Sequence, residues 1–120
     1  MRGLLIKGLS VTDVHANELD DYYRLLEVDT IDIVTRKING KYFDIVCDDE
    51  ALFKTYPVPT VFDTDKQPMI FGNIIIAGLA DDAGNMTDLT DEDINRICEN
   101  LGMIRFVDGS KHACLVNVKY

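Results

Sequence analysis

The chain has 120 residues, 47% of them hydrophobic, and its 12 basic and 21 acidic side chains give a net charge of −9. This length and apolar content predict one folded domain, not a disordered chain. The acidic balance argues against direct binding to nucleic acid or anionic membranes, because both require clustered Lys and Arg side chains.

Cysteine usage and the apolar runs indicate the compartment. The three cysteines are odd in number and show no C-x-x-C spacing, which favours reduced thiols in the cytoplasm over a disulfide framework. The longest uncharged apolar stretch, residues 69–80, is broken by glycines and is shorter than a membrane-spanning helix. The N-terminus does not resemble a signal peptide.

The first elements along the chain are predicted to be a strand and a helix. Residues 3–7 form an apolar run between two glycines, which is typical of a buried strand. Asn17 is a suitable N-cap for a helix that ends near residue 27. Leu19, Tyr22, Tyr23 and Leu26 would form the apolar stripe of this helix, and its other face is acidic.

A hairpin is predicted next. Two strand-like runs, residues 31–38 and 41–47, flank Asn39-Gly40, a dipeptide that favours a two-residue type I′ turn. This turn would place Ile38 opposite Lys41. Both faces of the hairpin carry apolar side chains, so the pattern leaves open which face meets the core.

The middle of the chain predicts a helical turn and further strands. Asp48 is expected to cap a turn at residues 51–54. Strands are expected at residues 60–62 and 69–77, joined by a polar loop, with residues 74–77 in the centre of a sheet. Gly84 supplies the positive φ for the turn that follows.

The second helix has the clearest start signal. Thr90 and Asp93 form a capping-box pattern, and Leu89 can pack on Ile94. The apolar stripe continues through Cys98 to Leu101, and Gly102 is expected to end the helix.

Two closing strands at residues 103–107 and 113–118 complete the predicted fold. The order of elements indicates one α+β domain over residues 1–120, with a mixed, mostly antiparallel sheet, the Asn-Gly hairpin and two main helices.

The acidic residues are concentrated in two segments. Residues 10–32 and 81–99 each carry seven acids against one arginine. Such surfaces can attract a basic groove on a partner protein and can mimic a nucleic-acid backbone. An alternative is that the acids only favour helix N-termini and keep the protein soluble. The candidate partner-binding residues are Asp20, Asp21, Asp81, Asp82, Asp88, Asp91, Glu92 and Asp93.

No pattern typical of catalysis or of a cofactor is present. Ser10 and Ser110 lie outside the known serine-nucleophile motifs, and the glycines at 72 and 78 do not form a phosphate-binding loop. The acids at 81 and 82 do not fit a calcium-binding EF-hand loop. We therefore expect no enzyme activity, no cofactor and no bound metal.

The thiols and imidazoles are predicted to act separately. His112 and Cys114 could share one strand face and bind zinc if Cys47 or Cys98 lay nearby, but no local spacing supports this. Packing as small hydrophobic side chains is the preferred interpretation of Cys47 and Cys98.

Several segments resemble a family of small proteins of unknown function encoded by bacteriophages and mobile elements of gut Firmicutes. The similar segments are residues 1–7, 31–50, 72–78 and 89–94, so the resemblance covers roughly the first hundred residues. It implies a phage-derived accessory protein inside the cell, and it implies no catalytic residue. Residues 103–120 lie outside it.

We therefore expect a non-enzymatic protein that binds and modulates a host protein, with counter-defence or nucleic-acid mimicry as its role. The alternative is a protein that binds or sequesters a small, nucleotide-like ligand, because an anionic ligand needs cationic or amide partners. Its candidate residues are Arg36, Lys37, Lys41 and Arg105. The sequence does not indicate the oligomeric state.

Overall fold

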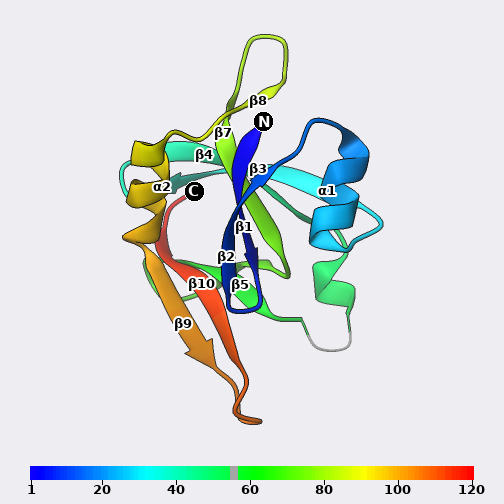
Figure 1. The fold of residues 1–120 in the computed structure, drawn as a ribbon. Coiled ribbons are helices and arrows are strands. Elements are labelled where there is room, and N and C mark those ends of the chain that lie inside the picture. The colour runs from blue at the N-terminus through cyan, green and yellow to red at the C-terminus, as the bar shows by residue number, and fades with distance from the viewer. Residues whose placement is uncertain (55–56) are drawn as a thin grey trace.

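The computed structural model describes residues 1–54 and 57–120 (Figure 1). Its elements in chain order are β1 (Arg2–Lys7), β2 (Ser10–His15), α1 (Leu19–Leu26), β3 (Ile31–Ile38), β4 (Lys41–Asp48), the 3-10 turn η1 (Ala51–Phe53), β5 (Pro59–Asp63), β6 (Pro68–Phe71), β7 (Ile74–Ala80), β8 (Met86–Thr87), α2 (Asp91–Cys98), β9 (Leu101–Arg105) and β10 (Lys111–Val118).

The strands form two sheets. The larger sheet has the order β2-β1-β7-β4-β3, with β8 paired to β7, and the smaller sheet has the order β6-β5-β10-β9. The described strand pairs are antiparallel apart from β5 with β10, which is parallel. The predicted α+β class with a mostly antiparallel sheet is confirmed.

The central strand β7 shows why both faces of the larger sheet are covered. Residues 74–77 are completely buried, and successive side chains of a strand point to opposite faces. Ile74 and Ile76 pack between the two sheets, in a cluster that includes Ile97 of α2. Ile75 packs on the other face, with Tyr22 and Leu26 of α1. The prediction of a central strand here is confirmed.

The strands β3 and β4 contribute to both of these clusters. They pair antiparallel with Ile38 opposite Lys41, and Asn39 and Gly40 have φ of 48° and 86°. Phe43 lies in the cluster between the sheets, whereas Val46 lies in the cluster under α1. Both faces of β4 are therefore buried along residues 43–48, whereas Ile33 and Tyr42 at the second face of the hairpin are exposed.

The strand β2 is absent from the sequence prediction. It pairs with β1 along its whole length, from Lys7 opposite Ser10 to Arg2 opposite His15. A local signal for it exists, because Gly8 has a φ of 58° and begins a two-residue turn before β-branched residues.

Two predicted caps are wrong. The N-cap of α1 is Glu18, not Asn17, and the Asp21 side chain accepts hydrogen bonds from both of their backbone N–H groups, at 3.0 and 2.8 Å. The N-cap of η1 is Glu50, not Asp48, whose carboxylate instead accepts from the Glu50 backbone N–H at 2.9 Å.

Two predicted element boundaries are also wrong. The run 69–77 is not one strand, because Gly72, with a φ of 83°, separates β6 from β7 and these strands belong to different sheets. Gly102 does not end α2: the helix ends at Cys98, and Gly102 lies within β9. The capping box of Thr90 and Asp93 is confirmed.

Candidate functional site

Arg2 joins acidic residues from two separate segments, β2 and the stretch that leads from β8 into α2. Its guanidinium lies 2.9 Å from Asp13 on β2 and 2.9 Å from Asp91 at the start of α2. Its backbone N–H donates to Asp88 at 2.7 Å. Hydrogen bonding to Asp13, and then to Asp91, raises the pKa of Arg2, and the Arg2 bond lowers the pKa of Asp13. Asp88 also lies 3.9 Å from the N-terminal ammonium. Three carboxylates therefore meet two positive charges here, and this surface keeps a net negative charge.

We call the surface formed by Asp13, Asp88, Asp91 and Glu92 the acidic flank. The Asp88 and Asp91 side chains are 72% and 90% exposed, and Glu92 is also exposed. Within residues 1–54 and 57–120, Glu92 makes no side-chain hydrogen bond or ion pair. Most of the acidic flank is therefore accessible to a partner.

Two other candidate acids, Asp81 and Asp82, lie in the turn between β7 and β8, which projects from the end of the larger sheet (Figure 1). The Asp81 carboxylate accepts hydrogen bonds from the backbone of Ala83 and Asn85, at 2.9 and 3.0 Å. It therefore stabilises the turn, whereas Asp82 is exposed beside it.

Asp93 differs from the other candidate acids because it is buried. It exchanges capping-box hydrogen bonds with Thr90 and lies 2.6 Å from the Lys41 ammonium on β4. Burial alone would raise the pKa of Asp93, but the hydrogen bonds from Lys41 and Thr90 outweigh it, and the pKa lies below its usual value. The side chain attaches α2 to the β3–β4 hairpin and is not free for a partner.

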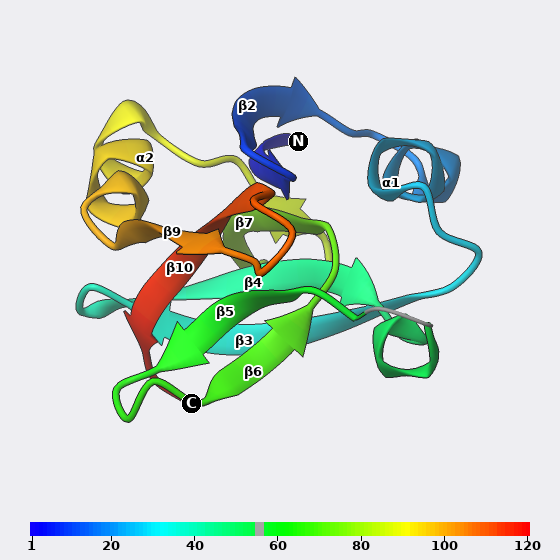
Figure 2. The same ribbon diagram turned by 90° about the horizontal axis from the view of Figure 1, so that it is seen from below.

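The acids of α1 do not join the acidic flank. The two helices pack against opposite faces of the larger sheet, and Figures 1 and 2 show them on opposite sides of the molecule. Asp21 completes a capping box with Glu18, and Asp20 is exposed. Acids from the two helices therefore do not form one exterior surface.

The four candidate basic residues do not form one site either. Arg36 lies over the Tyr120 ring at 4.8 Å, and Lys41 pairs with Asp93. Lys37 points to the opposite face of β3 from Arg36, and Arg105 lies on β9 in the smaller sheet. Arg36 and Lys37 are therefore separated by the opposite faces of one strand, and Arg105 is separated from both by lying in the other sheet.

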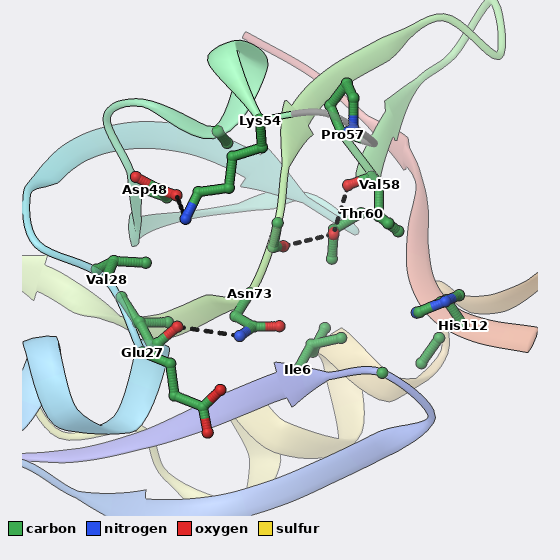
Figure 3. A pocket seen from close by; sticks show the side chains of 15 residues that line it. Ile6, Glu27, Val28, Asp48, Lys54, Pro57, Val58, Thr60, Asn73 and His112 are labelled. Atoms are coloured by element: carbon green, nitrogen blue, oxygen red, sulfur yellow. Dashed lines mark hydrogen bonds and ion pairs between the residues drawn. The ribbon is translucent and has the colours of Figure 1, made fainter.

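A cavity of about 220 Å³ lies between the end of α1, η1 and the start of β10 (Figure 3). Its charged wall holds Lys54, which pairs with Asp48 at 3.2 Å. Asn73 donates to the Leu26 carbonyl oxygen at 3.0 Å, and His112 lies on the other side of the space. The polar groups nearest each other are thus already paired, and the cavity offers no unpaired cation among the residues drawn.

The cysteines and His112 have different surroundings. Cys47 is buried, and burial raises the pKa of its thiol to about 11. Cys98 is exposed on α2, so the prediction that it packs in the core is wrong. The His112 ring lies edge-to-face against Phe106, with centroids 5.0 Å apart. In the described part of the chain, no three His, Cys, Asp or Glu side chains gather around a possible metal position.

A family model described as a domain of unknown function (DUF3846) matches residues 1–102. The chain belongs to this family. No curated protein and no solved structure matches the chain. Across the described residues, no helix is both long and apolar enough to cross a membrane.

The family match ends inside β9, but the folded structure extends beyond it. β10 lies between β5 and β9 in the smaller sheet, and its Leu115 and Val118 side chains are completely buried. The last eighteen residues, 103–120, therefore supply part of the core on which the DUF3846 segment packs.

The sequence analysis missed Arg2 and Asp13 as site residues. Both lie on the β1–β2 hairpin, where they come within hydrogen-bond distance through the register that places Arg2 opposite His15. Recognition of the Gly8 turn would have predicted this pairing, but it would not have predicted the contacts of Arg2 with Asp88 and Asp91.

Proposed function

We propose that this protein is a non-enzymatic binding protein that modulates a host protein through the acidic flank. One observation carries the proposal: Asp13 and Asp91 both pair with the guanidinium of Arg2, and Asp88 accepts from the backbone N–H of the same residue. This arrangement fixes an excess of carboxylates on an exposed surface. Glu92 adds a further negative charge beside it.

The partner surface should be basic. Carboxylates held in fixed positions attract a cationic groove over long range and disfavour acidic competitors. A groove that normally holds a nucleic-acid backbone has this character, so nucleic-acid mimicry is the mode of action that we propose. Asp20 and Asp21 of α1 are outside the proposed interface because α1 packs on the other face of the larger sheet.

The proposed setting is a bacteriophage or mobile element, with the protein acting in the cytoplasm of the host, where counter-defence is a suitable role. The resemblance of residues 1–7, 31–50, 72–78 and 89–94 to proteins of such elements supports this setting. The three free cysteines, two of them buried, suit a reducing compartment.

The proposal is tested by affinity capture from host lysate, with mass spectrometry of the retained proteins. The test variant is Asp91→Asn with Glu92→Gln, and the matched control is Asp20→Asn with Asp65→Asn, which removes the same charge from exposed positions elsewhere. The wild type and the control should retain the same basic partner. The test variant should bind it about tenfold more weakly, and binding should fall as salt rises. Equal retention by both variants, or binding that is insensitive to salt, would contradict the proposal.

The alternative function, binding of a small nucleotide-like ligand, needs free cationic or amide donors. The cavity of Figure 3 does not favour it, since Lys54 is paired with Asp48 there. Among the four candidate basic residues, Lys37 has the most suitable surroundings, because it lines a different pocket that has no acidic residue in its wall.

A further inference from the structure

A second pocket, of about 410 Å³, lies where β3 and β10 end. Figure 2 shows the ends of β3, β5 and β10 on the same side of the molecule. Two lysines, three asparagines and a threonine line the pocket, and none of its lining residues is acidic. This composition is unusual in a chain with a net charge of −9. The polar residues are Lys37, Asn39, Thr64, Asn100, Asn117 and Lys119.

The two lysines lie directly opposite each other. The backbones of Lys37 and Lys119 form an antiparallel bridge, with N···O distances of 2.8 and 3.0 Å. Residues opposite each other in such a bridge point their side chains to the same face, and like charges in this arrangement repel. No carboxylate pairs with either ammonium group among the described residues. The Lys37 ammonium instead lies 5.6 Å from the centre of the Tyr42 ring.

Opposed cations alone do not define a site in this protein. Lys111 lies opposite Arg105 on β9 in the same way. Neither residue lines this pocket, and Lys111 and Arg105 are both exposed. What distinguishes Lys37 and Lys119 is the set of neutral hydrogen-bond donors that surrounds them.

These donors come from separate parts of the chain. Asn117 has a φ of 57°, a left-handed conformation that Asn tolerates better than most residues, and it lies where the pairing of β10 with β5 shifts register. Asn100 uses one amide hydrogen on the Val116 carbonyl oxygen at 3.1 Å and keeps a second. The Asn39 side-chain amide already donates to the Glu99 carboxylate and to the Arg96 carbonyl oxygen. It therefore lines the pocket without offering a free donor. Thr64 adds a hydroxyl from the β5–β6 turn.

We propose that this Lys37–Lys119 pocket binds the phosphate group of a small phosphomonoester. A phosphate dianion accepts hydrogen bonds on its oxygens and would neutralise the two opposed ammonium groups. The volume lies within the range of ligand pockets and leaves space for the organic part of the molecule. The site gives the alternative, ligand-binding function a location, and it is independent of the acidic flank, so either proposal can fail alone.

The test is an NMR titration of the full chain with inorganic phosphate, with AMP and with adenosine, at constant ionic strength. Phosphate and AMP should shift the resonances of Thr64, Asn100 and Asn117, and adenosine should not. AMP should bind more tightly than phosphate, because the pocket has space for the organic group beside the phosphate. Equal affinity would assign the site to the phosphate alone and would overturn the phosphomonoester proposal.

Two variants with the same charge change distinguish phosphate binding in this pocket from a general attraction of anions to positive charge. Lys119→Gln should weaken phosphate binding about tenfold, which corresponds to the loss of one charged hydrogen bond. Lys111→Gln relieves the other opposed pair and should leave phosphate binding unchanged. Equal weakening in both variants, or the same resonance shifts with chloride as with phosphate, would overturn the proposal. Binding of a short single-stranded RNA without binding of AMP would also overturn it, because it would indicate a nucleic-acid surface.

Discussion

The helices α1 and α2 have the same length and similar acidic first turns, yet different forces attach them to the sheets. α1 is held by apolar contacts, with Tyr22 and Leu26 buried against the larger sheet. α2 buries Ile97, but it is also fixed by polar contacts to the β3–β4 hairpin. Similar charge patterns therefore do not imply similar roles: in α2 one acid is a structural link, whereas others remain exposed on the acidic flank.

The largest expected effect concerns the apolar attachment of α1. Leu26→Ala should lower the free energy of unfolding by about 2–5 kcal/mol, because Leu26 is completely buried and its truncation leaves a cavity. Urea denaturation measures this loss. Leu19→Ala is the control on the same helix, and at 56% exposure it should change stability by no more than about 0.5 kcal/mol. Similar losses in both variants would show that α1 is not held by its buried face.

The polar attachment of α2 is tested by Asp93→Asn. This change removes the charge from the capping box and from the Lys41 contact, and it should cost about 1–2 kcal/mol at neutral pH. Asp91→Asn is the control, because Asp91 lies in the same turn but is exposed. It should cost about 0.5 kcal/mol or less.

The same variant has a defined pH dependence. The pKa of Asp93 is lower in the folded chain than its usual value, so the unfolded chain takes up the proton more readily. The stabilisation is complete above the unfolded-state pKa of about 3.9 and is lost as pH falls through the folded-state value. The difference between wild type and Asp93→Asn should therefore shrink from pH 7 to pH 3. A constant difference in urea titrations would contradict an ionic contribution from Asp93.

The smallest expected effect is that of Asn39→Gly, in the hairpin turn that α2 contacts. The Asn39 amide donates to Glu99 at 2.6 Å, and the Asn39 carbonyl accepts from Arg96 at 2.7 Å. Asn39→Gly keeps the positive φ and removes only the side-chain contact, so it should cost about 0.5–1 kcal/mol. Asn39→Ala should cost about 1 kcal/mol more, because its φ becomes strained. Thermal unfolding of the two variants measures both values, and equal stabilities would show that the backbone is not strained.

Local signals explain which parts of the fold could be predicted. The Thr90–Asp93 capping box and the buried run at residues 74–77 depend on neighbouring residues, and the structure has both. The missed break at Gly72 has a different cause. The apolar pattern continues across it, and only the presence of two sheets requires the chain to turn there.

The site was less predictable than the fold. The sequence analysis grouped Asp88, Asp91 and Glu92 with Asp93 as candidates, but Asp93 is buried. The capping-box pattern already implied a structural role for Asp93. The contact with Lys41 depends on the hairpin lying beside α2, which no local spacing encodes.

By itself, the sequence determined the α+β class, the strong negative charge, the central strand and the start of α2, since each follows from composition or from residues a few positions apart. Only the tertiary structure decided that Asp13, Asp88 and Asp91 meet at Arg2, and that Lys37 lies opposite Lys119. The physical reason is that these contacts depend on strand order and on the packing of two sheets. Those arrangements are set by burial across the whole chain, and local patterns do not specify them.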